Sequence, residues 1–167
     1  MISAAGTATL EGVNAVDLVN NTVAAATILA NDAEITNIIG GTYTSSGATT
    51  LAATVEIGGV TVQAQGAANL TAGADIVDSM IAGFTVDLTS TAGNIANTAV
   101  EAQTTANLTA TAGSILDSTV TANDATLSAV AANIAGTTVT AFNDATLAAV
   151  VLSANAISAG HDATLTG

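Results

Sequence analysis

The sequence contains no lysine, no arginine and no cysteine. With 13 acidic side chains and a formal net charge of −13, the chain offers no cation to the phosphates of a nucleic acid or to an anionic membrane surface. The composition therefore argues against nucleic-acid binding. The absence of cysteine excludes disulfides and thiolate metal sites. Since no salt bridge to a basic side chain can form, stability has to come from burial and from backbone hydrogen bonds.

Large apolar groups and long apolar runs are also scarce. Aromatic residues make up 2% of the 167 positions, so the core must be built from small side chains with the backbones close together. No stretch approaches the roughly 18 unbroken apolar residues of a membrane-spanning helix, and we expect no membrane span. The first twelve residues, MISAAGTATLEG, lack the basic segment and the apolar run of a signal peptide, so an export signal would have to lie outside this sequence.

Three apolar columns recur about every 19 residues, which is the signature of a repeat protein. The first column is isoleucine, the second is valine or isoleucine five residues later, and the third is leucine. The first column contains Ile57, Ile76, Ile95, Ile115 and Ile134. The second contains Val62, Ile81, Val100, Val120 and Val139. The third contains Leu70, Leu88, Leu108, Leu127 and Leu147. We interpret these residues as the structural core.

Alternation within each unit predicts strands. Val120 and Ala122 should face one side while Thr119 and Thr121 face the other. Turn residues, mostly Gly, Asn, Asp and Ser, separate the alternating runs. Gly and Asn should supply left-handed corners there, as in Ala-Gly-Asn at 92–94 and Ala-Gly-Ser at 112–114. Common helical repeats need about 33 residues or more. The sequence therefore predicts an all-β parallel β-helix (β-solenoid), right-handed, in which roughly eight or nine coils spaced about 4.8 Å apart form a rod about 40 Å long.

The whole chain, 1–167, is predicted to form a single solenoid domain. Residues 1–37 should form irregular first coils, 38–156 regular coils, and 157–167 a partial last coil that Ile157 opens. The segment 148–156 is interpreted as a bulge or an expanded corner. Two polar rows should face outward: one contains Thr71, Thr89, Thr109 and Ser128, and the other contains Asn69, Asp87, Asn107, Thr126 and Thr146.

Four segments resemble the haemagglutinin repeats of filamentous-haemagglutinin-like exoproteins. They are ANLTATAGSI (106–115), NLTAGADI (69–76), DLTSTAGNI (87–95) and ATLSAVAANI (125–134), and the resemblance covers roughly 38–167. It implies a right-handed parallel β-helix from a very long adhesin or toxin-delivery stick that two-partner secretion exports. The localisation that it implies is extracellular, at a bacterial cell surface.

Three aspartates are candidate calcium ligands. Asp124, Asp144 and Asp162 recur in NDATL or HDATL and should fall near one edge, where stacked carboxylates would repel each other unless a cation lies between them. The alternative is a solvated turn in which the aspartates accept backbone hydrogen bonds. Asp78 and Asp117 share another turn column. We predict no catalytic residue, His161 included, no cofactor other than this possible Ca²⁺, and no enzymatic activity.

Two weaker surface patterns also occur. Thr-x-Thr pairs at Thr42/Thr44, Thr119/Thr121 and Thr138/Thr140 suggest an ice-binding array, which Met80/Ala82 and Ala99/Glu101 interrupt. Asn20, Asn69 and Asn107 begin glycosylation sequons, which chance also produces in a chain rich in Asn and Thr.

The function predicted from these patterns is a structural shaft or stalk segment of an adhesin-like surface protein, or a subunit that stacks into filaments. The partners would be neighbouring repeats, identical subunits stacked end to end, or ligands on a host or partner cell. A binding module for ice, Ca²⁺ or glycan that uses a flat Thr/Asn face is the alternative. A β-helix leaves open sheet edges at its ends, and no amphipathic capping helix is evident in the sequence.

Overall fold

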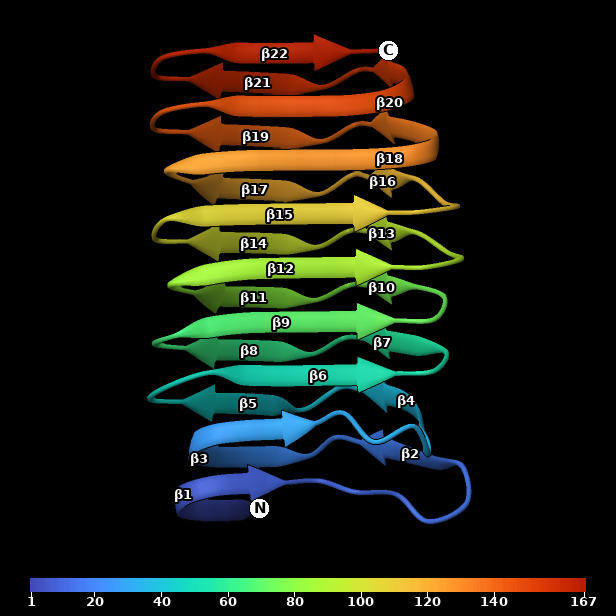
Figure 1. Ribbon diagram of the computed structural model, residues 1–167, viewed down its shortest axis with the longest axis vertical. Helices are drawn as coiled ribbons and strands as arrows, with labels where there is room; N and C mark the ends of the chain where they lie inside the picture. Colours follow the sequence, from blue (N-terminus) through green and yellow to red (C-terminus); the bar gives the residue numbers. More distant parts are fainter.

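The computed structural model describes residues 1–167 and consists of strands and turns, which form one continuous 22-stranded parallel sheet. The chain winds through about nine coils, and each inner coil pairs with the coil before it and the coil after it (Figure 1). The predicted all-β parallel β-solenoid with coils of about 19 residues is confirmed. The structure contains no helix with the length and hydropathy that a membrane span requires.

Each full coil contributes one strand segment to each of three faces, which we number by the apolar column that they carry. The first face contains β2 (Val16–Val19), β4 (Ile35–Ile39), β7 (Glu56–Gly58), β10 (Ile76–Val77), β13 (Ile95–Ala96), β16 (Ile115–Leu116) and the last residues of β18 (Asp124–Ala135) and β20 (Ala145–Ser153).

The second face contains the first part of β1 (Ile2–Thr9) and of β3 (Thr22–Ala30), then β5 (Thr42–Ser45), β8 (Thr61–Ala64), β11 (Met80–Gly83), β14 (Ala99–Ala102), β17 (Thr119–Ala122), β19 (Thr138–Ala141) and β21 (Ala156–Ala159). The third face contains the second part of β1 and β3, then β6 (Thr49–Ala53), β9 (Ala67–Ala72), β12 (Thr85–Ser90), β15 (Thr105–Ala110), the first part of β18 and β20, and β22 (Ala163–Thr166).

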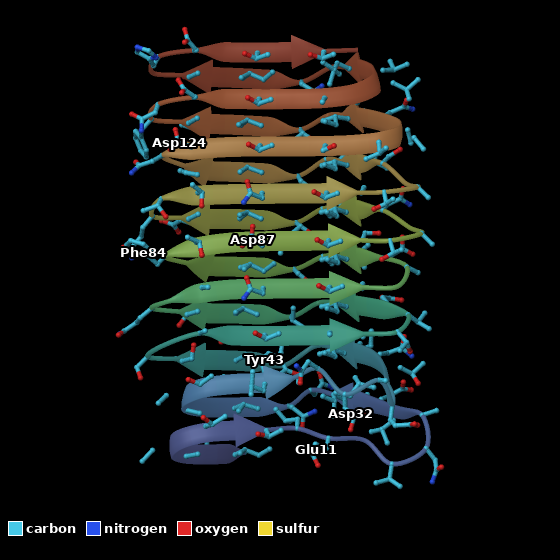
Figure 2. All side chains as sticks on the ribbon, in the orientation of Figure 1. Glu11, Asp32, Tyr43, Phe84, Asp87 and Asp124 are labelled. Atoms are coloured by element: carbon cyan, nitrogen blue, oxygen red, sulfur yellow. The ribbon has the colours of Figure 1, made fainter.

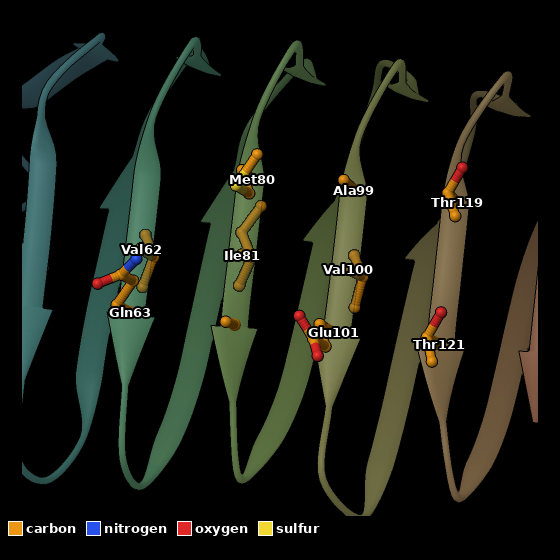
Figure 3. A pocket seen from close by; sticks show the side chains of 10 residues that line it. Val62, Gln63, Met80, Ile81, Ala99, Val100, Glu101, Thr119 and Thr121 are labelled. Atoms are coloured by element: carbon orange, nitrogen blue, oxygen red, sulfur yellow. The ribbon is translucent and has the colours of Figure 1, made fainter. Parts of the chain in front are cut away.

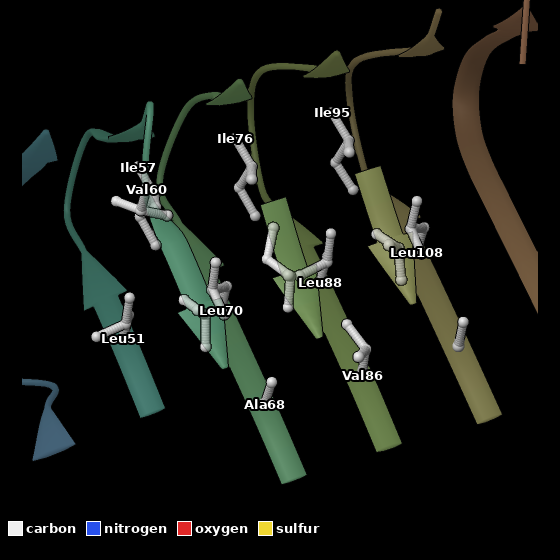
Figure 4. Close-up of a cluster of buried hydrophobic side chains, with 14 of the residues drawn as sticks. Leu51, Ile57, Val60, Ala68, Leu70, Ile76, Val86, Leu88, Ile95 and Leu108 are labelled. Carbon is white, nitrogen blue, oxygen red and sulfur yellow. The ribbon is translucent and has the colours of Figure 1, made fainter. Parts of the chain in front are cut away.

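The three apolar columns lie in register along the axis of the rod. Ile76 pairs with Ile57 on one side and with Ile95 on the other, and the valine and leucine columns are aligned in the same way. Every column residue named from the sequence is at most 3% exposed. Figure 4 shows the resulting core, in which each side chain packs against residues of the same column in the adjacent coils.

The corner that follows the first face uses a left-handed residue in each coil. These residues are Asn20, Gly40, Gly59, Asp78, Asn97, Asp117, Gly136 and Ala154, with φ between 47° and 65°, and in one coil Gly41 adds a second. Gly, Asn and Asp tolerate this region best, which explains the composition of this turn column. The backbone ladder continues through the corner, because the N–H of Asp78 donates to the carbonyl of Ala96 at 3.1 Å.

The corner that precedes the first face differs from the prediction. Gly93 and Gly113 were expected to supply left-handed backbone there, but neither has a positive φ. Glycine is needed because the coils approach closely: a Cβ on Gly93 would lie 2.7 Å from the carbonyl carbon of Ala74.

Four hydroxyl-bearing residues of the corner that follows the first face are buried. Ser79, Thr98, Ser118 and Thr137 follow the left-handed residues and are at most 3% exposed. The hydroxyl of Ser79 donates to the carbonyl of Val77 at 2.7 Å and accepts the N–H of Val60 at 3.2 Å. These hydroxyls therefore satisfy backbone groups where the chain turns.

The coil boundaries near the two ends are now defined. Register shifts between Ala4 and Thr7 and between Val16 and Asp17 make the first coils irregular. Ile157 does not open a coil, because it pairs with Val139 in the second column, and Leu152 is the residue that pairs with Ile134. The segment 148–156 is not an expanded corner: Ala149 pairs with Ala129 and Val151 with Asn133, so the corner is two residues shorter than the one below it.

Tyr43 occupies the second column, where other coils carry valine or isoleucine. Its side chain is fully buried, and its hydroxyl has no well-formed hydrogen bond. Desolvation raises the pKa of Tyr43 to about 12, and the side chain of Asn21 opposes this shift in part. Burying an unpaired hydroxyl costs about 1–3 kcal/mol in proteins.

The protein should lose stability between about pH 10 and pH 12. The folded state holds the Tyr43 proton up to a pKa of about 12, whereas the unfolded chain releases it near pH 10. The unfolded state then binds fewer protons, so the free energy of unfolding falls as pH rises through this window. With one tyrosine and no lysine, arginine or cysteine, no other side chain titrates there. Urea unfolding should show this loss in the natural chain and not in Tyr43→Phe, and an equal loss in both would contradict it.

Candidate functional site

The three candidate calcium ligands lie in consecutive coils at the corner between the second and third faces. Asp124 Oδ1 accepts the N–H of Asp144 at 3.3 Å, and Asp144 Oδ1 accepts the N–H of Asp162 at 3.1 Å. The carboxylates of Asp124 and Asp144 thus cap the backbone of the next coil, as the alternative to a calcium ladder predicts. Figure 2 shows Asp124 at this edge of the rod.

His161 lies beside Asp144 and Asp162, and this contact was not predicted from the sequence. Its Nδ1 lies 3.3 Å from Asp144 Oδ1 and 3.5 Å from Asp162 Oδ2. Potential ligand atoms of these three residues lie within 4.8 Å of one another, and all three residues are exposed. The signal was available: HDATL aligns with NDATL, so His161 had to fall in the same corner. The geometry permits a weak ion pair when His161 is protonated.

The second face carries the Thr-x-Thr pairs. Thr119 is aligned with Thr138 of the next coil, and Thr121 with Thr140. Two of the three Thr-x-Thr motifs therefore lie in adjacent coils. The residues interrupting the array form an open depression, shown in Figure 3. It is lined by Val62, Gln63, Met80, Ile81, Ala82, Ala99, Val100, Glu101, Thr119 and Thr121.

The third face carries the two polar rows. Asn69, Asp87, Asn107, Thr126 and Thr146 are paired in sequence along the axis, as are Thr71, Thr89, Thr109 and Ser128. Asn107 Nδ2 donates to Asp87 Oδ1 at 2.6 Å, which fixes the orientation of both side chains. Figure 2 shows the rows as parallel lines of polar sticks on the front of the rod. This face presents regularly spaced hydroxyl, amide and carboxylate groups.

The remaining candidates lie at corners or within these rows. Asp78 and Asp117 are left-handed corner residues with φ of 51° and 47°. Of the sequon asparagines, Asn20 also occupies this corner, whereas Asn69 and Asn107 face outward on the third face.

A further side-chain ladder precedes the first column. Asp75 Oδ1 accepts the N–H of Asn94 at 2.7 Å, Asn94 Oδ1 accepts that of Ser114 at 2.9 Å, and Ser114 Oγ accepts that of Asn133 at 3.3 Å. Acidic and amide side chains at the corners therefore bind backbone donors of the next coil.

No protein-family model, no curated protein and no solved structure matches the chain. The structure shows a parallel β-solenoid, and the resemblance to haemagglutinin repeats stays a prediction.

The capping role of the Asp124 corner predicts insensitivity to calcium. Melting temperatures in Ca²⁺ and in a chelator should agree, because the carboxylates already accept backbone hydrogen bonds. Asp124→Ala should lower the free energy of unfolding by about 0.5–1.5 kcal/mol, while Asp124→Asn, which keeps an acceptor, should stay within about 0.5 kcal/mol of the natural chain. A clear rise of the melting temperature with Ca²⁺, lost in both variants, would instead support a calcium ladder.

Proposed function

We propose that this chain is a structural shaft, a rigid spacer segment of an adhesin-like protein exported to a bacterial cell surface, with no enzymatic activity. The single observation that carries this proposal is the continuous ladder of 22 strands, in which apolar columns run in register from coil to coil. Bending the rod would separate coils on one side and break parallel backbone hydrogen bonds there, so the ladder resists bending.

The surface of the rod supports the same role. Carboxylates lie mostly at corners, and the net charge of −13 keeps neighbouring shafts apart. The absence of lysine and arginine removes every trypsin cleavage site, which suits a protein exposed to extracellular proteases. The resemblance to haemagglutinin repeats supports the location at a cell surface.

A spacer should lengthen by whole coils without losing rigidity. Residues 95–133 comprise two coils, and a second copy inserted after Asn133 preserves the register because Ile134 follows the same pairing as Ile95. The insertion should increase the length by about 10 Å, two strand spacings. Spin labels on Thr42→Cys and Thr138→Cys, exposed residues on the second face, should report this increase with an unchanged narrow distribution.

A matched control duplicates residues 95–124, which do not make up whole coils. The insertion breaks the register of the apolar columns, so a smaller fraction of the protein should fold. A broad distance distribution in the natural-length chain would contradict the rigid shaft.

A binding module on the third face is the second candidate function. The observation that favours it is the pair of polar rows, which repeat the same groups in consecutive coils. Such a surface presents hydrogen-bonding groups at a constant spacing of about 4.8 Å along the axis, and it suits a periodic ligand such as ice or an extended glycan.

A bulky side chain in the polar rows should abolish this binding and leave the rod intact. Thr109→Tyr places a ring in the middle of one row, and Thr119→Tyr places the same ring on the second face as a control. The measurements are thermal hysteresis for ice and retention on an insoluble polysaccharide for glycan. Equal activity of both variants, or none in the natural chain, would exclude the third face as a binding surface.

A further inference from the structure

Both phenylalanines of the chain lie on the surface of the rod. The only other aromatic residue, Tyr43, is fully buried, whereas Phe84 is 48% exposed and Phe142 is 65% exposed. An exposed phenyl ring forgoes the stability that its burial in the core would contribute. A single exposed apolar side chain needs no explanation, but large apolar groups that gather at one place mark an interaction site. The positions of the two rings therefore decide what they mean.

The two rings occupy the same position of the repeat, at the corner between the second and third faces. Phe84 follows the second-column residue Ile81 by three positions, and Phe142 follows Val139 by three positions. Because the second column is in register from coil to coil, the two phenylalanines lie on one line parallel to the axis. They are three coils apart, which is about 14 Å. Figure 2 shows Phe84 on the same edge of the rod as Asp124.

Amide side chains occupy this position in the neighbouring coils. Gln65 lies one coil before Phe84, and Gln103 and Asn123 lie in the two coils between Phe84 and Phe142. Gln65 and Gln103 are exposed, and Asn123 is half-buried. We name the line of these five residues the corner ridge. Since a primary amide both donates and accepts hydrogen bonds, the ridge presents apolar rings next to groups that can bind hydroxyls.

The backbone of the corner ridge is already paired within the ladder. The N–H of Phe84 donates to the carbonyl of Gly66 at 2.8 Å, and the N–H of Phe142 donates to the carbonyl of Ala122 at 3.0 Å. The carbonyl of Phe84 accepts the N–H of Thr104 at 2.9 Å and the Thr104 hydroxyl at 2.8 Å. A peptide that adds a strand to a sheet needs unpaired backbone groups, so the ridge does not fit such a ligand.

The shape of the corner favours a polymer over a small molecule. Neither Phe84 nor Phe142 lines any of the four depressions of the rod. A small ligand is normally held by enclosure of most of its surface, which the ridge does not provide. A ligand of the ridge therefore has to make several contacts along the axis.

Carboxylates border the corner ridge, which is itself uncharged. Glu101 lies two residues before Gln103, Asp124 directly follows Asn123, and Asp144 lies two residues after Phe142. An anionic polymer would be repelled there, since the chain has no lysine or arginine to attract it. A cationic polymer would be attracted by the carboxylates, but that attraction would not use the rings or the amides. The composition of the ridge therefore fits a neutral polymer.

We propose that the corner ridge binds a neutral, extended polysaccharide that lies parallel to the axis of the rod. A pyranose unit has a face of C–H groups, which packs against a phenyl ring, and hydroxyls at its rim, which amides bind. Phe84 and Phe142 hold two units of one polysaccharide chain, and Gln103 and Asn123 bind hydroxyls of the units between them. The ridge is separate from the polar rows of the third face, and the proposal depends neither on those rows nor on the shaft function.

Fluorine NMR tests the proposal, because para-fluorophenylalanine labels Phe84 and Phe142 and no other residue. Phe84→Tyr and Phe142→Tyr each remove one resonance and so assign both. The neutral β-linked oligosaccharides cellohexaose and N-acetylated chitohexaose are the probes, and at least one of them should shift both resonances. The corresponding disaccharide is too short to reach both rings, so it should need a concentration about 10-fold higher or more. No shift with either hexasaccharide, or equal affinity for the disaccharide, would overturn the proposal.

Phe84→Leu provides the second test, because it keeps an apolar side chain and removes the ring. With the Phe142 resonance as the readout, this variant should bind the hexasaccharide about 10-fold more weakly, whereas Phe84→Tyr should bind it as tightly as the natural chain. The control Val130→Ala removes a different exposed apolar side chain and should leave binding unchanged. Equal binding by Phe84→Leu and the natural chain would overturn the proposal.

Two further outcomes would assign the ligand or the surface differently. Shifts with hexalysine but with neither neutral hexasaccharide would indicate a basic peptide as the partner and overturn the proposal. Loss of hexasaccharide binding in Thr109→Tyr but not in Phe84→Leu would place the glycan on the third face and overturn the role of the ridge. An acidic oligogalacturonate should shift neither resonance, and a shift as large as that with the neutral probe would contradict the selection by charge.

Discussion

The structure depends on one constraint: along the axis, the nearest neighbour of each side chain is its counterpart about 4.8 Å away in the next coil. A charge in such a row meets a like charge, so the interior rows must be neutral and close in size. In a chain without lysine or arginine, no ionic network can offset a poor fit. Cohesion comes instead from the buried apolar columns and from 115 backbone hydrogen bonds, while the only ion pairs are two exposed contacts of His161.

The same constraint shapes the polar atoms of the interior. Hydroxyls such as those of Ser118 and Thr98 are admitted because each donates to a carbonyl of its own coil. Tyr43 is the exception, since its ring fills the second column but its hydroxyl finds no well-formed bond. At the corners, aspartate and asparagine cap the backbone of the next coil, and the capping residues Asp75 and Asp124 are half-buried at the edges.

Much of the fold could be predicted, because a column of aligned core residues appears in the sequence as a pattern that repeats with each coil. Ile76 and Ile95 are 19 positions apart, and only a full turn of the chain brings them together. Near the ends this signal failed. Leu152 replaces isoleucine in the first column, and Ile157 resembles a first-column residue although it occupies the second. Composition alone could not distinguish the two, since backbone register decides which isoleucine faces which column.

The candidate site was predictable only as far as it is periodic. The outward rows and the aspartate corner followed from spacing, whereas the contact of His161 with two carboxylates depends on side-chain orientation at an exposed corner. The role of Gly93 could not be predicted either. The sequence shows a glycine in both cases, whether two coils approach closely or the backbone is left-handed.

The interchangeability of the coils has a genetic consequence. Since Ile95, Ile115 and Ile134 occupy equivalent positions, unequal recombination between the corresponding stretches of coding sequence adds or removes complete turns. Such an event leaves every surviving contact of the same kind as before, so the length of the protein can vary between lineages without a damaging intermediate.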